Sequence, residues 1–182
     1  MASRDEEFAR FFHQFYPSLC RFLECLLGGR GVAAQTAQDL AQDAFLQLHR
    51  AGFENFPEGE ARFWLFRVAR NMALNELSKG QTRHRLFDRV VDAFRAHAPR
   101  PDELFEMTET KTRVHEMLKT LPEHQRAALL LREQEELSYR EIAGVLGVSE
   151  AKVKVDVFRA RTAMRERRSK AQGASAAGGN AV

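Results

Sequence analysis

The stretch Ser138-Tyr-Arg-Glu-Ile-Ala-Gly-Val-Leu-Gly-Val-Ser149 decides the fold of the second half of this chain. Ser138 and Glu141 have the spacing of a capping box, in which each side chain accepts a hydrogen bond from the other residue's backbone N–H, so a helix is predicted to begin there. Gly147 is typical of the tight turn that ends such a helix. Residues 150–168 then predict a longer, basic helix. Helix, short turn and basic helix together form the plan of a helix-turn-helix unit.

The basic helix predicted over residues 150–168 has two chemically different sides. Val153 and Val157 are predicted to pack inward against the preceding helix. Side chains that suit phosphates and base edges project from the other side: Lys152, Lys154, Arg159 and Arg161. In a helix-turn-helix the second helix enters the major groove of DNA, where such groups are needed. The pattern therefore favours a DNA-binding domain.

Prolines between the basic blocks of the chain indicate a domain boundary. Pro99 and Pro101 interrupt regular structure and are followed by a run of acidic residues. We expect a first domain at residues 1–95, a flexible linker at 96–110, a second domain at 111–170 and a disordered tail rich in Ala, Gly and Ser at 171–182. Because no segment alternates as a strand would, the predicted fold class is all-α, with two small helical domains.

Apolar residues at helical spacing predict three helices in the first domain, at residues 6–27, 36–50 and 60–79. Pro17 lies within the first of them, where we expect either a kink or two abutting helices. The second helix has four residues at i, i+3, i+4 and i+7 that predict an exposed acidic face ending in an apolar residue: Asp39, Gln42, Asp43 and Leu46. The third helix carries a polar stripe of Arg67, Asn71, Asn75 and Lys79.

Charge alternates in sign along the 182 residues. Two basic blocks, residues 61–100 and 139–182, have net charges of +6 and +5, and the two acidic blocks that precede them have −4 each. Separated basic blocks in an otherwise acidic chain point to two surfaces that contact a polyanion.

Several classes of protein are disfavoured by the sequence. Cys20 and Cys25 cannot form a disulfide framework or a paired metal-ligand motif, and we expect buried free thiols. No apolar run reaches the ~18–20 residues that span a bilayer, and the start of the chain lacks the order of a secretory signal, so we expect a cytoplasmic protein without membrane insertion. Catalytic motifs and phosphate-binding loops are absent, so we expect no enzyme, cofactor, metal site or small-molecule substrate.

Three segments, in order, resemble a known family. They are Asp39-Leu-Ala-Gln-Asp-Ala-Phe45, Phe63-Trp-Leu-Phe-Arg-Val-Ala-Arg-Asn71 and the stretch from Tyr139-Arg-Glu-Ile-Ala to Val157-Phe-Arg-Ala-Arg161. The chain resembles the extracytoplasmic-function (ECF) class of the sigma-70 superfamily of bacterial RNA polymerase sigma factors. The resemblance runs from Phe8 to Arg168 and implies a transcription initiation factor that recognises −10 and −35 promoter elements.

The resemblance implies a role for each surface. Contact with the clamp helices of the largest polymerase subunit falls to Asp39, Gln42, Asp43 and Leu46. Contact with the opened −10 strand falls to Phe56, Arg62, Arg67, Arg70, Asn71, Asn75 and Lys79. Contact with the −35 duplex falls to Arg140, Ser149, Lys152, Lys154, Phe158, Arg159 and Arg161. Such factors are often held inactive by an anti-sigma protein, which is a further expected partner.

The chain departs from the family's pattern at two residues of the basic helix. Val155 and Asp156 stand where members commonly have a small polar residue and then a basic one. We expect Asp156 to lie near DNA, where it would repel phosphate and could accept a hydrogen bond from a cytosine amino group. The departure bears on which −35 sequence is read.

Other functions remain open at this point. A stand-alone helix-turn-helix regulator would bind duplex DNA through the second domain without polymerase, while its first domain would sense a ligand or dimerise. A protein-binding adaptor would require both basic blocks to be incidental. An enzyme is the weakest alternative, because the six histidines are scattered along the chain.

Overall fold

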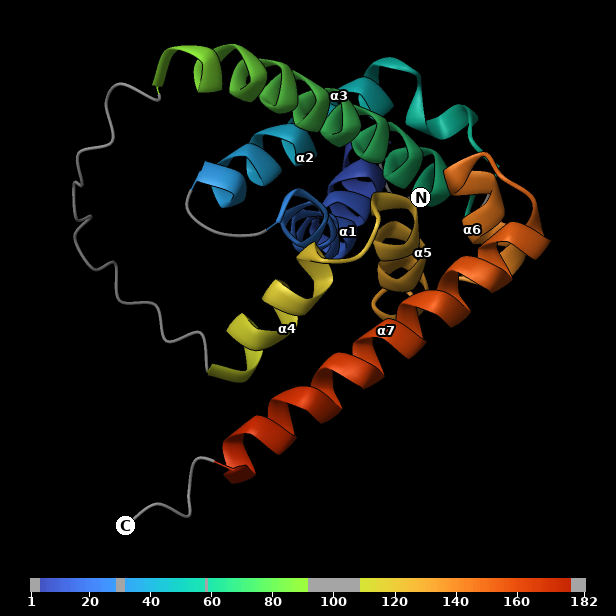
Figure 1. The fold of residues 1–182 in the computed structure, drawn as a ribbon. Helices are drawn as coiled ribbons and strands as arrows, with labels where there is room; N and C mark the ends of the chain where they lie inside the picture. Colours follow the sequence, from blue (N-terminus) through green and yellow to red (C-terminus); the bar gives the residue numbers. More distant parts are fainter. Residues whose placement is uncertain (1–3, 29–31, 58, 92–108, 178–182) are drawn as a thin grey trace.

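The computed structural model describes residues 4–28, 32–57, 59–91 and 109–177, and its regular elements are all helices (Figure 1). For residues 32, 80–91, 109–112 and 171–177 it describes the helical backbone alone. The predicted all-α class with two helical domains is confirmed.

The first domain consists of α1 (Arg4–Leu27), α2 (Val32–Arg50), a 3-10 turn (Phe53–Asn55) and α3 (Glu60–Val91). Both α2 and α3 pack against the C-terminal half of α1, where Leu19, Phe22 and Leu23 are fully buried. The Phe22 and Phe66 rings meet edge to face at 5.4 Å. Buried aromatic and leucine side chains at helical spacing thus hold these helices together.

Helix boundaries in the first domain differ from the predictions in three places. The alternative of two helices around Pro17 is wrong, because α1 continues as one helix. Aromatic side chains on both sides of Pro17, including Phe15 before it and Phe22 after it, pack on the same core and compensate for the lost backbone bond. The second helix begins at Val32 rather than at residue 36, and the third continues past residue 79 to Val91.

The second domain consists of α4 (Glu109–Lys119), α5 (Glu123–Glu133), α6 (Tyr139–Leu146) and α7 (Glu150–Ala177). The predicted capping box is confirmed: the Ser138 N–H donates to Glu141 Oε2 at 2.6 Å, and the Glu141 N–H donates to Ser138 Oγ at 3.3 Å. Gly147 has φ of 67°, the left-handed conformation that ends α6 and starts the turn.

The ends of the second domain differ from expectation. Disorder is predicted from residue 171, whereas α7 continues to Ala177, because the alanines of this segment favour a helix. The last five residues lie outside the described ranges. Most of the predicted linker, residues 96–108, lies outside them as well, and its last two residues belong to α4.

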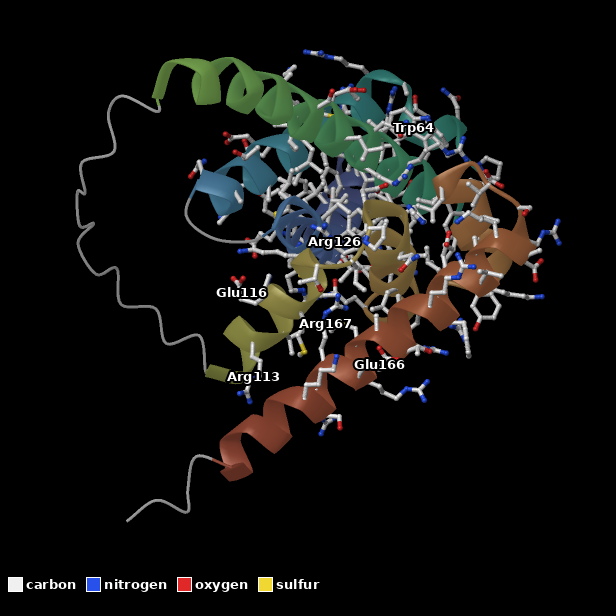
Figure 2. The ribbon with its side chains drawn as sticks, in the orientation of Figure 1. Trp64, Arg113, Glu116, Arg126, Glu166 and Arg167 are labelled. Carbon is white, nitrogen blue, oxygen red and sulfur yellow. The ribbon has the colours of Figure 1, made fainter. Side chains whose placement is uncertain are left out.

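The two domains pack against each other. Helix α1 contacts α4 and α5, and α3 contacts α6. Arg126 of α5, labelled in Figure 2, donates to the Leu26 carbonyl at 2.8 Å and to the Leu121 carbonyl at 3.1 Å, so it joins the end of α1 to the second domain. Its burial lowers the pKa of this guanidinium. Cys25, a buried free thiol as predicted, lies 3.3 Å from His115 Nε2 in the same interface.

Candidate functional site

The outer face of α2 presents the predicted acidic surface to solvent. Asp39, Gln42 and Asp43 are exposed, and Leu46 is 53% exposed although it is a large apolar residue. The opposite side of α2 is fully buried at Ala37, Ala41, Ala44 and Leu48. This burial fixes the rotation of the helix, so all four predicted residues lie on one accessible face. We refer to them as the α2 face.

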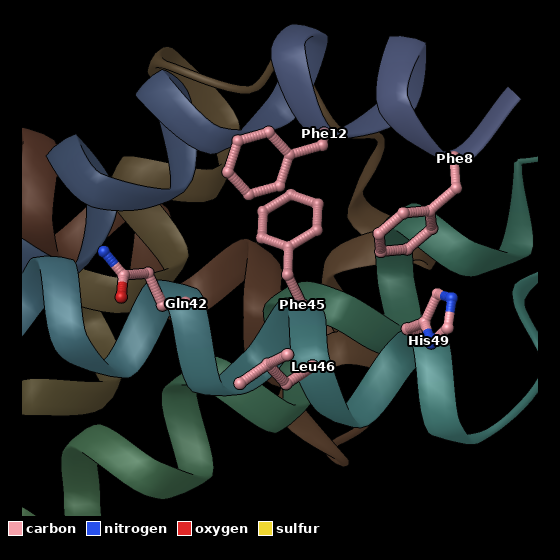
Figure 3. A pocket seen from close by; sticks show the side chains of 6 residues that line it. All are labelled: Phe8, Phe12, Gln42, Phe45, Leu46 and His49. Carbon is pink, nitrogen blue, oxygen red and sulfur yellow. The ribbon is translucent and has the colours of Figure 1, made fainter. Parts of the chain in front are cut away.

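A pocket adjoins the α2 face (Figure 3). It has a volume of about 420 Å³ and lies between the N-terminal part of α1 and the outer side of α2. Phe12 and Phe45 meet there with ring centres 4.8 Å apart, and Phe8 meets His49 at 5.0 Å. Its lining residues are Phe8, Phe12, Gln42, Phe45, Leu46 and His49. Gln42 and Leu46 belong to both features, so the acidic face continues into an aromatic hollow.

The predicted polar stripe of α3 is exposed. Arg67, Asn71, Asn75 and Lys79 are all accessible to solvent. Beside the start of this helix, the half-buried Phe56 ring lies 5.5 Å from the ring of Trp64. Trp64 is labelled in Figure 2 and is itself half-buried, so it offers part of its surface to solvent. The stripe and the aromatic pair thus form one continuous candidate surface.

Two further predicted residues of α3 face the second domain instead. Arg62 donates to Glu135 Oε2 at 3.0 Å and to the Glu135 carbonyl at 2.7 Å. Arg70 forms a bidentate pair with Glu123, with distances of 2.9 and 3.0 Å. Their side chains are 26% and 12% exposed. In this arrangement of the domains, both cations are therefore neutralised by carboxylates of the second domain.

The exposed side of α7 carries most of the predicted duplex-binding residues. Lys154, Phe158 and Arg159 are accessible, as is Arg140 on α6. Ser149 accepts a hydrogen bond from the Lys152 N–H at 3.2 Å and so caps the start of α7. The predicted inward packing of Val153 and Val157 is confirmed, with exposed fractions of 0% and 1%.

Local carboxylates accompany several of these cations. Lys154 Nζ lies 2.8 Å from Glu150 Oε1, and this bond raises the pKa of the Lys154 ammonium. Arg161 bonds Glu133 of α5 at 2.6 Å, which raises its pKa in the same way. The Lys154 and Arg161 side chains nevertheless stay 56% and 42% exposed, so phosphate groups can reach both.

The expectation that Asp156 lies near DNA is wrong. Asp156 is 1% exposed, and both of its carboxylate oxygens lie 2.6 Å from Lys152 Nζ. His124 Nε2 of α5 lies 3.6 Å from the same carboxylate. The residue falls on the buried side of α7 because it continues the helical spacing of Val153, Val157 and Ala160.

Sequence reasoning missed two features of these surfaces. One is the aromatic pocket, for which the recurring phenylalanines of α1 were the available signal. The other is the set of acidic partners, Glu123 and Glu135, which lie 53 and 73 residues from the arginines that they bind. No local sequence pattern indicates pairs so distant in the chain.

Neither a cluster of metal-ligating side chains nor a membrane-spanning helix is found in the part of the chain that the structure describes. In that part, His, Cys, Asp and Glu side chains nowhere gather in threes as a metal ion would require. None of its helices combines the length and apolar character needed to cross a bilayer.

Comparison with known proteins assigns both domains. Residues 11–83 match the family model for sigma-70 region 2, and residues 111–164 match that for sigma-70 region 4. The RNA polymerase sigma-H factor of Pseudomonas aeruginosa is 40% identical over 144 residues, which is 72% of each chain. The chain belongs to the ECF class of sigma-70 factors. The ECF sigma-E factor of Escherichia coli is a second relative, 33% identical over 150 residues and 76% of each chain.

Two solved structures have the same fold as this chain. The sigma factor RpoE of Bartonella quintana, solved in complex with the anti-sigma factor NepR, has a TM-score of 0.65 and 24% identity, covering 90% of this chain and 97% of that one. CnrH, solved with the cytosolic domain of CnrY, has a TM-score of 0.62 and 20% identity, covering 90% and 88%. As a sigma factor, the protein directs RNA polymerase to promoters and is not an enzyme. This membership sets aside the stand-alone regulator.

Proposed function

We propose that the α2 face binds the clamp helices of the largest polymerase subunit. Its two carboxylates can accept charge-assisted hydrogen bonds from arginines, and Leu46 supplies an exposed apolar contact at the end of the face. The observation that carries the proposal is that all four residues of this face are exposed, while the opposite side of α2 is fully buried. The adjoining aromatic pocket can receive an apolar side chain of the same partner.

The opened −10 strand is the proposed ligand of α3. Single-stranded DNA is bound by cations along the backbone and by aromatic platforms that replace lost base stacking. The exposed stripe supplies Arg67 and Lys79, and its asparagines can bond base edges. Phe56 beside Trp64 supplies the aromatic surface. Arg62 and Arg70 join this surface once the second domain has moved away from α3.

The −35 duplex is the proposed ligand of the helix-turn-helix unit. Lys154, Arg159 and Arg161 suit phosphates and base edges, and Arg140 and Ser149 lie at the edge of the same surface. Lys152 instead holds the buried Asp156, so its contribution to phosphate binding is smaller than its position in the sequence suggests. We further propose that the protein acts in the cytoplasm and that an anti-sigma factor regulates it; the similar RpoE was solved in complex with the anti-sigma factor NepR.

Charge reversal tests the α2 face. The variant Asp39→Arg with Asp43→Arg should abolish binding to core polymerase. Two positive charges then replace the two carboxylates and repel the arginines of the partner. Asp5→Arg with Glu7→Arg is the matched control, since it makes the same change in net charge on exposed positions of α1. Binding is measured by size-exclusion chromatography and helical content by circular dichroism. If both variants bind core polymerase equally well, the polymerase contact lies outside the α2 face.

In vitro transcription tests the two promoter surfaces together. Core polymerase is supplied with a genomic DNA library, with and without the protein, and the 5′ ends of the transcripts are mapped. We expect new start sites that share two upstream elements about two helical turns apart, because their spacing mirrors the separation of two DNA-binding domains. Start sites with only one shared element would contradict the assignment of one of the domains.

A further inference from the structure

The exposed side of the helix-turn-helix carries large apolar side chains as well as cations. The described residues include five exposed large apolar side chains, and three of them lie here: Val148 in the turn, and Val155 and Phe158 on α7. Val155 is 43% exposed, and Phe158, at 67%, is the most exposed of the five. Val155 and Phe158, three residues apart on one helix, are suited to a partner group that is itself apolar.

Val155 and Phe158 are neighbours on the outside of α7. Their i, i+3 spacing places their Cβ atoms roughly 5–6 Å apart and separates them by about 4.5 Å along the helix axis. The core of the domain is filled from the other side of α7 by Val153, Val157 and Ala160. The exposed pair is therefore not part of the core and is available to a partner.

Cations flank this apolar pair. Lys154 precedes Val155 with its side chain 56% exposed, and Arg159, also exposed, directly follows Phe158. Arg159 and Arg140 form no ion pair within the described residues. A protein partner with a surface of mixed charge would not require cations on both sides of the apolar pair. An apolar ridge between cations matches the major groove, where phosphates line both edges and the C5-methyl of thymine is the apolar group on the floor.

We propose that Val155 and Phe158 read thymine in the −35 element by packing against its methyl groups. The proposal rests on the proposed binding of the −35 duplex by α7. It also accounts for Val155, which stands where family members commonly have a small polar residue. An aliphatic side chain at this position makes an apolar contact in place of a polar one. Because Asp156 is buried, its carboxylate does not reach cytosine. Its neighbour Val155 contacts the methyl group of thymine instead.

Deoxyuridine tests the proposal, because it pairs as thymine does and lacks only the methyl group. The upstream duplex selected by in vitro transcription is synthesised with deoxyuridine at each thymine in turn, and affinity for the reconstituted holoenzyme is measured by fluorescence anisotropy. We expect a three- to tenfold loss at one or two adjacent positions and no loss elsewhere.

Variants link that loss to the two side chains. Val155→Ala with Phe158→Ala should bind the thymine duplex more weakly and bind the thymine and deoxyuridine duplexes equally well. Val155→Thr, which keeps the shape and one methyl group, should retain part of the discrimination. Val114→Ala is the matched control, because Val114 is an exposed valine on α4 that lies outside the proposed contact, and it should keep the full deoxyuridine penalty.

Failure of this inference differs from failure of the proposed function. Binding to the thymine duplex without any deoxyuridine effect would overturn methyl recognition and leave the −35 assignment in place. A selected upstream element without thymine would overturn it as well. Unchanged DNA binding by the double alanine variant would assign the apolar pair to a protein partner. If the holoenzyme does not bind the upstream duplex at all, the proposed binding of the −35 element by α7 is itself wrong.

Discussion

The cations of α3 and those of α7 are held in different ways. On α3, Arg62 and Arg70 bind carboxylates of the other domain, and they are among the less exposed arginines of the surface. On α7, Lys152 and Lys154 bind carboxylates four residues away on the same helix. The pairs on α7 persist wherever the domain goes, whereas those on α3 exist only while the two domains touch.

The difference shows that the DNA surface of α3 depends on how the two domains are arranged, whereas that of α7 does not. Separation of the domains frees two arginines on α3 and changes little on α7. The two interdomain pairs are also unequal: Arg70 and Glu123 are bidentate, while Arg62 Nε and Glu135 Oε1 have no hydrogen-bond partner in the described residues. A buried pair with unmet hydrogen bonds stabilises less than a fully bonded pair, so the contact through Arg62 is the more suited to opening.

The largest expected effect comes from breaking both interdomain pairs. Glu123→Gln with Glu135→Gln replaces two carboxylates by neutral amides and so weakens two partly buried ion pairs, by about 3 kcal/mol together. We expect the free protein to expand, as measured by small-angle X-ray scattering. Affinity for a single-stranded −10 oligonucleotide should rise about tenfold, because Arg62 and Arg70 no longer have competing carboxylates.

A matched variant sharpens this comparison. Glu133→Gln with Glu150→Gln removes the same number of charges, but both partners, Arg161 and Lys154, lie in the second domain. It should leave the radius of gyration and the −10 affinity unchanged. Equal expansion of the two variants would mean that net charge, and not the interdomain pairs, controls the domain arrangement.

The second prediction concerns the buried carboxylate of α7. Lys152→Met leaves Asp156 facing only His124, so stability should fall by about 2 kcal/mol, below the loss for a fully buried pair because Lys152 itself is half exposed. Thermal denaturation followed by circular dichroism measures the change. Lys154→Met is the control and should not change stability, since its partner Glu150 remains solvated. Equal melting temperatures of both variants would contradict the role given to Asp156.

The helix-turn-helix was predictable because its signals are local. The capping box, the glycine turn and the inward valines all act within a few residues, and each prediction was confirmed. The same reasoning misplaced Asp156, because a charged residue was expected at the surface although the helical spacing placed it with Val153 and Val157. Here a nearby lysine made burial of the carboxylate possible.

The site on the first domain was less predictable. Exposure of the α2 face follows from the buried alanines behind it, and a helical wheel shows both. The orientation of Arg62 and Arg70 does not follow from α3, because it depends on glutamates that the folded chain brings in from the second domain. Sequence patterns thus identified the cations but not their partners.

The third prediction tests a local contact that domain opening should leave intact. Ser138→Ala removes the side-chain acceptor for the Glu141 N–H and should lower stability by about 1 kcal/mol. Chemical denaturation measures this loss. The loss should be the same in the Glu123→Gln, Glu135→Gln background, because the cap lies within the second domain. A loss that disappears in the opened protein would show that α6 is held by α3 and not by its own cap.

The smallest expected effect is a pH dependence at the same cap. Hydrogen bonds from Ser138 lower the pKa of the Glu141 carboxyl below its ordinary value of 4.5. A carboxyl with a lowered pKa stabilises the fold fully above its unfolded value, and this contribution is lost as pH falls toward the folded pKa. Glu141→Gln keeps an acceptor without the titration. The free energy of unfolding of the unmodified protein should therefore fall more steeply than that of the variant between about pH 5 and pH 3. Parallel curves would mean that the carboxylate is not bonded to Ser138 in solution.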